Sequence, residues 1–451
     1  MRRLSTNRPL PAVLFLAALG VVGALASAPA LAAAKGPAVV PIITTSDAVG
    51  SIKPCGCHIP KGGFARIASF VDSTRIQHGE TLVLDAGDFA ADVARTIENS
   101  KLDFQFDLMA LVGYDAIAVG ERELAYGLDR LHAASTRAKL PIVVTNLVDR
   151  GTGKPAFATT RVFRKNGVRV GVFALLSPKL QFTGPDSARL AVDDPMTVAQ
   201  QTVAELRKQA DVVVCLAHLG RVEGEDLAAQ VPGIDVVILA HHPGFVAQGR
   251  RVNNTVTVAS GEQGQNMGLT LLTMEGKKVV DLTSETRILM PEVGERADIA
   301  KMTKEFEDKL NAEQLKAQQS QAVQSAAPQP GQDQYLGTEN CMNCHKDQYD
   351  HWLTTQHAHA FATLERAQKE ATPECVQCHV VGFGRPGGYV NATASAKLKN
   401  VGCEVCHGYG TQHDMFAKTG GKVAEAVCVT CHTPANDPGW NYAAKLPRIS
   451  H

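Results

Sequence analysis

The chain has 451 residues, of which 45% are hydrophobic and 20% are charged, an ordinary globular balance for two or three domains. Its 45 basic residues match its 45 acidic residues, so the formal net charge is zero. This balance gives no reason to expect a nucleic-acid polymer or an anionic membrane surface as a partner.

Residues 1–32 are predicted to be a signal peptide. Three arginines within the first eight residues precede an apolar run at residues 12–25, and Ala30-Leu-Ala32 supplies a small-residue cleavage site. The alternative is a membrane anchor, but the apolar run is short for a span. We therefore expect a periplasmic or otherwise exported protein whose mature chain begins near Ala33, with no membrane span after cleavage.

Residues 38–292 alternate short apolar runs with helical stretches, which predicts an α/β domain. The runs are residues 39–44, 81–84, 116–119, 142–145, 168–174, 212–217 and 236–239.

Several of these runs end in polar residues that can bind a metal. Carboxylates and imidazoles at the strand ends of an α/β domain are where a metal-phosphate site would be assembled. The residues are Asp47, Asp85, Asp88, Glu121, Asn146, His218, His241 and His242.

The order of these segments resembles the calcineurin-like metallophosphoesterases and, within them, the exported 5'-nucleotidase branch. The resemblance implies a four-layer domain, in which two packed sheets are flanked by helices and the site lies at the strand ends. The matching segments run from about residue 38 to 245 and are residues 45–47, 62–66, 85–88, 113–120, 216–220 and 233–241.

The site departs from the family pattern at three places. Asp47-Ala-Val stands where the family has Asp-x-His, and Ala-His241-His-Pro stands where it has Gly-His-x-His. Gly-Glu121-Arg122-Glu replaces Gly-Asn-His-Glu. Glu121 can bind a metal in place of Asn, whereas Arg122 cannot give a proton to a leaving group because it stays charged.

By this resemblance, one metal site keeps a full ligand set and the other does not. Asp47 and a shared Asp88 are too few for tight binding of a second ion, and two-metal hydrolysis needs both ions. No catalytic residue is assigned, and Glu121 and Arg122 are candidates. A phosphate ester or another small molecule is the expected ligand. The complete set, for one Zn, Mn or Fe ion, is Asp88, Glu121, His218 and His241.

Cys55-Gly-Cys57-His58 follows Asp47 on the loop expected to overhang the first metal position. Its two thiolates and imidazole could form a soft metal site, a redox-active cysteine pair or an ordinary disulfide. Cys215, on a predicted buried strand, is expected to pack as a small hydrophobe.

Residues 293–332 are predicted to be a helical linker. Lys, Glu, Gln and Ala dominate residues 296–326, in which Ile299, Met302, Phe306 and Leu310 recur at helical spacing. A Pro- and Gly-containing stretch at residues 326–331 then breaks the pattern.

Eight of the eleven cysteines follow this break, in four Cys-x-x-Cys-His motifs. Two thiols at this spacing can add to the vinyl groups of one haem, and the adjacent imidazole then reaches the iron. Chance would give roughly 0.01 such motif in this composition. Zinc and disulfides are the alternatives, but neither requires the histidine. The motif residues are Cys341, Cys344 and His345; Cys375, Cys378 and His379; Cys403, Cys406 and His407; and Cys428, Cys431 and His432.

Residues 333–451 are therefore predicted to be a small, mainly helical tetrahaem domain. Its 119 residues allow about 30 per haem, too few for an ordinary protein core. Four buried macrocycles would supply the missing apolar surface and would lie close enough for electrons to pass between them.

The segment from His351 to residue 360 and the segment at residues 402–413 resemble the cytochrome c-554-like multihaem family. The resemblance implies that His357 and His413 are distal haem ligands, with His359 as the alternative to the first. His351 and His451 are expected to be solvated surface residues.

We expect electron transfer with a redox partner protein in the periplasm, through a small transient contact. One alternative is an active metal-dependent phosphoesterase with redox haems. The other is an oxidoreductase in which the haems feed the Cys55 and Cys57 site.

Overall fold

The computed structural model describes residues 37–55, 59–91, 99–324, 333–367, 369–412, 423–434 and 436–451. The predicted signal peptide lies outside these residues. Within the described ranges, no helix combines the length and the apolar character that crossing a bilayer requires.

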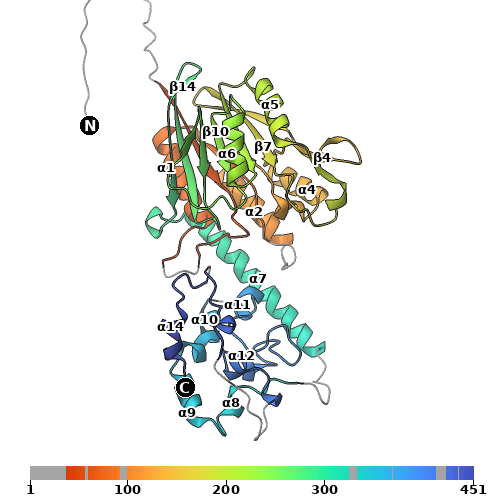
Figure 1. Cartoon of the computed structure of the whole chain (residues 1–451), viewed down its shortest axis with the longest axis vertical. Coiled ribbons are helices and arrows are strands. Elements are labelled where there is room, and N and C mark those ends of the chain that lie inside the picture. Colours follow the sequence, from red (N-terminus) through yellow and green to blue (C-terminus); the bar gives the residue numbers. More distant parts are fainter. Residues whose placement is uncertain are drawn as a thin grey trace, which may run out of the picture. The chain divides into compact units, whose positions relative to one another are not determined.

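One five-stranded sheet contains the first strands of the chain (Figure 1). Its strand order is β14-β13-β1-β2-β3; β1, β2 and β3 run parallel, and the β13–β14 hairpin pairs antiparallel with β1. The strands are β1 Ala38–Thr45, β2 Leu82–Asp85, β3 Ala116–Ile117, β13 Asn266–Glu275 and β14 Lys278–Ile288.

A six-stranded sheet has the order β11-β12-β10-β9-β7-β6, with β7, β9, β10 and β12 parallel. A small three-stranded sheet of order β5-β4-β8 lies apart from both. The strands are β4 Leu147–Asp149, β5 Lys154–Pro155, β6 Thr160–Lys165, β7 Val168–Leu176, β8 Leu190–Val192, β9 Val212–His218, β10 Val236–Leu239, β11 Arg250–Val252 and β12 Thr255–Ala259.

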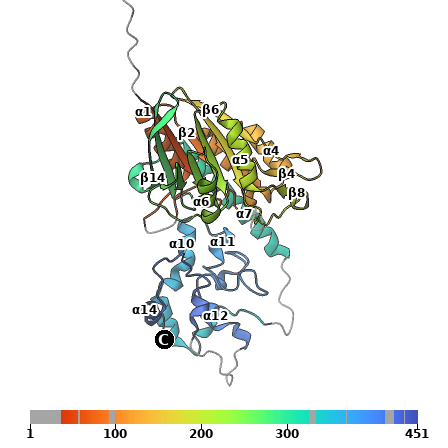
Figure 2. The same cartoon turned by 45° about the horizontal axis from the view of Figure 1, so that its top comes forward.

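The alternation of side chains along β9 shows how the layers are built. Val212 and Val214 join the cluster between the two sheets, whereas Val213 and Cys215 pack beneath the helices of the outer face. Helices α5 and α6 cover that face (Figure 2), and α1, α2 and α4 cover the outer face of the five-stranded sheet. The four-layer prediction is confirmed. The helices are α1 Phe64–His78, α2 Asn99–Val112, α3 Glu121–Leu124, α4 Leu128–Ala138, α5 Pro195–Leu206 and α6 Arg221–Gln230, with 3-10 turns at Ser187–Arg189 and Pro291–Val293.

One expected strand does not form as such. Ile142 and Val143 each make a single isolated bridge, to Ile117 and Ala158 respectively, so residues 142–145 extend no ladder.

Helix α7, Ala297–Gln324, occupies most of the predicted linker. Its first half is not free, because Ile299 is fully buried in the core of the domain. The Phe306 ring also stacks on Phe104 with the centroids 4.1 Å apart.

The C-terminal region is mainly helical, as predicted. Its helices are short, and a cluster of eight buried residues around Phe361 and Tyr389 forms its core within the described part. The helices are α8 Thr338–Cys341, α9 Lys346–Leu353, α10 Ala360–Arg366, α11 Pro373–Val376, α12 Cys403–His407, α13 Glu425–Cys428 and α14 Tyr442–Lys445. The 3-10 turns are Gln356–His359, Ala396–Leu398, Gly410–Gln412 and Leu446–Arg448.

Candidate metal centre and haem-attachment motifs

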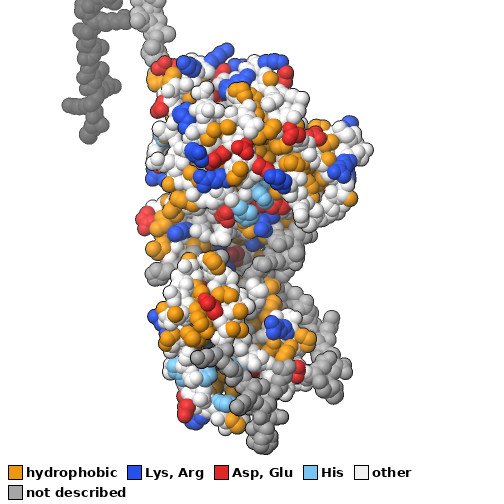
Figure 3. Space-filling model, in the orientation of Figure 1, with side chains coloured by type: hydrophobic (Ala, Val, Ile, Leu, Met, Phe, Trp, Pro, Cys, Tyr) orange, Lys and Arg blue, Asp and Glu red, His pale blue; other side chains and the backbone are white. Residues whose placement is uncertain are grey.

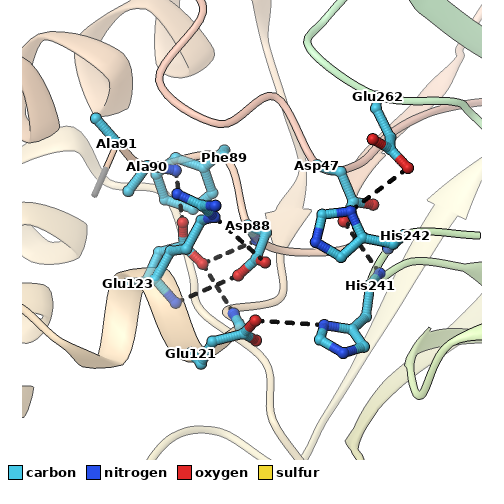
Figure 4. Close-up of polar contacts among 12 residues, drawn as sticks. Asp47, Asp88, Phe89, Ala90, Ala91, Glu121, Glu123, His241, His242 and Glu262 are labelled. Carbon is cyan, nitrogen blue, oxygen red and sulfur yellow. Dashed lines mark hydrogen bonds and ion pairs between the residues drawn. The ribbon is translucent and has the colours of Figure 1, made fainter. Parts of the chain in front are cut away.

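The ends of parallel strands bring four predicted ligands together. Asp88 follows β2, Glu121 begins α3 after β3, His218 ends β9, and His241 follows β10. One ligand atom from each of the four lies within 4.8 Å of the others. Figure 4 shows the side chains of Asp88, Glu121 and His241 converging from separate segments. Asp47, the fifth residue expected at this edge, is not part of the group.

Glu121 is the centre of the contacts. Its Oε2 lies 3.1 Å from His218 Nε2, and its Oε1 lies 3.3 Å from His241 Nδ1. His218 Nε2 also lies 3.7 Å from Asp88 Oδ1. The other ring nitrogen of His218 is 3.0 Å from the Ala86 carbonyl oxygen, so Nδ1–H donates there and Nε2 faces the cluster.

The Asp88 loop is held by a residue to which the sequence analysis assigned no role. The buried Glu123 carboxylate accepts backbone N–H groups from Asp88 at 2.9 Å, Ala90 at 2.6 Å and Gly120 at 2.8 Å. A Cβ atom at Gly120 would lie 2.2 Å from Asp88 Oδ1 and 2.5 Å from His218 Nε2. Only glycine therefore allows the ligands to approach this closely.

Burial and mutual charge set the protonation of the group. Burial raises the pKa of Asp88 to about 7. Burial alone would lower the pKa of His218, but the hydrogen bond to Glu121 and the charge of Asp88 raise it to about 9. Burial would raise the pKa of Glu121, but hydrogen bonds from His218 and His241 hold it well below its usual value. Two carboxylates and two imidazoles at this spacing fit a divalent first-row metal ion such as zinc, manganese or iron.

Asp47 lies beside the group and contacts its backbone. Its Oδ1 accepts the backbone N–H groups of His241 and His242, each at 3.1 Å. Its Oδ2 is buried without a hydrogen-bond partner, and burial raises the pKa of this carboxyl. His242 Nδ1 points instead toward Glu262 Oε1, 3.5 Å away (Figure 4). Asp47 thus positions His241 through its backbone N–H group.

The two remaining features of the predicted site have different outcomes. Arg122 lies at the group, with its Nε 3.7 Å from Asp88 Oδ2. Cys55 is partly buried, and its Sγ accepts the Lys61 backbone N–H at 3.3 Å. Cys57 and His58 lie outside the described residues, so the thiolate site stays a prediction.

Two of the motif histidines have a defined partner at Nδ1. His379 Nδ1 is 2.7 Å from the Ala360 carbonyl oxygen, and His432 Nδ1 is 2.9 Å from Asp437 Oδ2. A histidine that donates from Nδ1 presents Nε2 as a metal ligand, so both side chains fit the proximal position of a haem.

Two further histidines face motif histidines. The His357 ring centroid lies 6.2 Å from that of His432, and the His451 centroid lies 5.9 Å from that of His407. With metal–nitrogen bonds of about 2 Å on each side, such separations leave room for one iron between the rings. His451 was expected to be a solvated surface residue; it is exposed but lies against His407.

The other expected distal ligands differ in outcome. His413 lies outside the described residues. His359 is exposed, and His351 is half-buried, with Nε2 shielded from solvent and without a hydrogen-bond partner. The expectation that His351 is a solvated surface residue is therefore not met at this nitrogen.

The attachment cysteines of different motifs lie near one another. The thiol of Cys403 raises the pKa of Cys341, and burial together with the thiol of Cys431 raises the pKa of Cys378. Burial together with the charge of Cys428 raises the pKa of Cys406. The first motif therefore lies beside the third, the second beside the fourth, and the third also beside the fourth. None of the ten described cysteines forms a disulfide. On the face in Figure 3, histidine side chains are visible in both the domain of residues 38–292 and the C-terminal region.

Comparisons with known proteins agree with both halves of this description. Residues 340–408 match the family described as cytochrome c554 and c-prime. The N-terminal part is 25% identical over 259 residues to the uncharacterized metallophosphoesterase YunD of Bacillus subtilis, covering 54% of this chain and 56% of that protein. It is 28% identical over 190 residues to a 5'-nucleotidase of Vibrio cholerae, covering 40% of this chain and 34% of that protein.

A solved 5'-nucleotidase precursor from Thermus thermophilus has the same fold, with a TM-score of 0.55 and 24% identity over 61% of this chain and 59% of that one. The chain joins a metallophosphoesterase-like domain to a cytochrome c554-like region. It spans about half the length of the Bacillus subtilis relative and about a third of that of the Vibrio cholerae relative. The cytochrome c554-like region indicates haem as a cofactor.

Proposed function

We propose that the protein is an exported c-type cytochrome with four haems that transfers electrons, and that its metallophosphoesterase-like domain has an altered site holding one divalent metal ion. The observation that carries the proposal is the presence of four Cys-x-x-Cys-His motifs within residues 341–432, in a region similar to cytochrome c554. Export is proposed because residues 1–32 read as a signal peptide and because c-type haem attachment suits that compartment.

The histidine geometry supports electron transfer by at least two haems. His357 with His432, and His451 with His407, would each supply both axial ligands of one iron. An iron with two imidazole ligands is low-spin and has no open position, which favours electron transfer over ligand binding. The hydrogen bonds at Nδ1 of His379 and His432 hold those rings in orientation.

The first test is to make the protein with haem-attachment machinery and to measure its iron and haem per chain. We expect four haems, and three when Cys428 and Cys431 are both changed to serine. We expect His357→Ala and His451→Ala each to convert one haem to the high-spin form in the absorption spectrum. His359→Ala tests the alternative ligand, and we expect it to leave these haems low-spin because His359 is exposed. Zinc without iron would overturn the proposal.

Export is tested by sequencing the N-terminus of the purified protein. We expect it near Ala33, in the periplasmic fraction of a Gram-negative host. An intact N-terminus retained with the membranes would contradict export as a cleaved protein.

The single metal ion is supported by the four-residue group of Asp88, Glu121, His218 and His241. We expect elemental analysis to find one non-haem metal per chain, and His241→Ala to lose it. The matched control is His242→Ala, because His242 is adjacent in sequence but faces Glu262 rather than the group. Equal loss in both variants would contradict this ligand set.

A second candidate function is metal-dependent phosphoester hydrolysis, favoured by the complete ligand group and by the similarity to a nucleotidase. Hydrolysis of bis(p-nitrophenyl) phosphate that His241→Ala abolishes would support it. If Arg122→His instead creates an activity that the natural protein lacks, the cytochrome proposal is favoured. Loss of redox turnover in Cys55→Ser at full haem content would support the oxidoreductase alternative, in which the haems feed the Cys55 and Cys57 site.

A further inference from the structure

Arg122 lies at the metal-ligand group, with one edge of its side chain near Asp88. Its backbone N–H donates to Asp88 Oδ1 at 3.3 Å, and its Nε lies 3.7 Å from Asp88 Oδ2. The side chain is 26% exposed. Among the described residues, no hydrogen bond engages its two terminal nitrogens. A guanidinium that faces one carboxylate with Nε keeps a fork of N–H donors for a second anion.

The buried carboxylates near Arg122 favour a positive charge at its position. Asp47, Asp88, Glu121 and Glu123 supply four carboxylates, and a divalent ion with Arg122 would supply three positive charges. Buried charges need such compensation, and Asp47 Oδ2 and Asp88 Oδ2 are both buried without a hydrogen-bond partner. The site with its metal would therefore hold no excess positive charge before a ligand arrives.

We propose that Arg122 serves as the second cation of this site, so that a tetrahedral oxyanion group with a single negative charge binds between one metal ion and the guanidinium. Phosphodiesters and sulfate monoesters share this chemistry. A phosphomonoester dianion would add two negative charges to a site that holds no excess positive charge and is disfavoured for that reason. This inference rests on the proposed single metal ion and is independent of the haems.

The test measures anion binding by calorimetry on the haem-loaded, metal-loaded full chain, at pH 8. The probes are dimethyl phosphate and methyl sulfate, which carry one charge, and methyl phosphate, which carries two. We expect both monoanions to bind more tightly than methyl phosphate. The preferred monoanion then distinguishes a phosphodiester from a sulfate ester.

Three variants test the role of Arg122. We expect Arg122→Gln to weaken monoanion binding about 10- to 100-fold, the loss typical of a charge-assisted hydrogen-bond pair. Arg122→Lys keeps the charge but not the fork of N–H donors, so its monoanion affinity should lie between those of the natural protein and Arg122→Gln. Arg161→Gln, at an exposed arginine on edge strand β6, should bind as the natural protein does.

Metal content is measured on the same samples, so that the two proposals fail separately. One metal ion with unchanged monoanion affinity in Arg122→Gln would overturn the role of Arg122 alone. Tighter binding of methyl phosphate than of the monoanions would overturn the charge argument. The absence of non-haem metal in the natural protein would overturn the metal centre, and the haem count would still stand. Circular dichroism of each variant checks that it folds.

Discussion

At the scale of single residues, the motif histidines differ in the group to which their Nδ1–H donates a hydrogen bond. His379 donates to a neutral carbonyl, whereas His432 donates to the Asp437 carboxylate, which Lys445 also contacts at 2.7 Å. A carboxylate partner makes an imidazole a stronger donor to its metal and so stabilises the oxidised iron.

We therefore expect Asp437→Asn to raise the reduction potential of the haem bound by the fourth motif. Changing a partner of this kind typically alters metal-ligand energetics tenfold or more, which for one electron corresponds to about 60 mV. The measurement is a potentiometric titration followed by absorption spectra. Glu365→Gln removes the same charge from an ion pair with Lys399 and should leave all potentials within experimental scatter. Equal shifts in both variants would mean that only the net charge matters.

Glu123 is a second residue whose role depends on its surroundings. Its buried carboxylate accepts three backbone N–H groups that shape the Asp88 loop. The amide of Gln would place an N–H₂ group against those donors and leave at least one unsatisfied. We expect Glu123→Gln to lower the free energy of unfolding by about 2 kcal/mol in calorimetry. Glu205→Gln, at an exposed surface pair, is the control and should change it little.

The protonation of the metal group predicts how metal binding depends on pH. In the metal-free protein the pKa of His218 is raised to about 9 and that of Asp88 to about 7, so at pH 7 to 9 His218 still holds a proton that a metal must displace. Metal affinity should therefore rise about tenfold per pH unit through this range and level off above it. Calorimetry in two buffers of different ionisation enthalpy would count the released protons. No proton release at pH 8 would contradict this assignment.

At the scale of elements, the parts that the sequence could predict are those with a local signal. The apolar runs that end in Asp88, His218 and His241 became strands whose ends meet, because parallel strands carry their carboxyl ends to one edge. The pairing of β13 with β1, which places Ala38 opposite Met274, has no local signal and was not predicted.

The roles of Glu123 and His451 likewise have no local signal in the sequence, and neither was predicted. Glu123 acts through a turn, and His451 reaches His407 across 44 positions of sequence. Residues 142–145 have a strand-like composition, but only single bridges form on either side of them.

Helix α7 is more than the predicted linker, because its first half packs against the domain of residues 38–292. Its predicted linker function implies exchangeable surface residues, but the Phe306 ring stacks on Phe104. We expect Phe306→Ala to lower the free energy of unfolding of the metallophosphoesterase-like domain by about 2 kcal/mol, from lost burial and ring stacking. Lys309→Ala, on the exposed side of the same helix, should have little effect in the same calorimetric scan. If the two variants are alike, the helix is only a spacer.

At the scale of the whole molecule, two parts of the chain are stabilised by different means. The metallophosphoesterase-like domain has three clusters of fully buried aliphatic and aromatic side chains between and outside its sheets. The cytochrome c554-like region has one described cluster of eight residues for a sequence of 119. Its attachment cysteines and histidines are mostly half-exposed. A region of this size with so small a core is not expected to fold without additional apolar groups.

We therefore expect the protein made without haem attachment to be folded only in its first part. Trypsin should digest the C-terminal region and leave a fragment that ends at Lys316 or Lys346, the two cleavage sites that flank the end of α7, whereas the haem-loaded protein should resist over its whole length. Calorimetry should correspondingly show one transition without haem and a second with it. The Cys428→Ser and Cys431→Ser double variant should be intermediate, because it lacks one macrocycle. Equal protection with and without haem would mean that the protein side chains alone form a sufficient core, and the argument from size would be wrong.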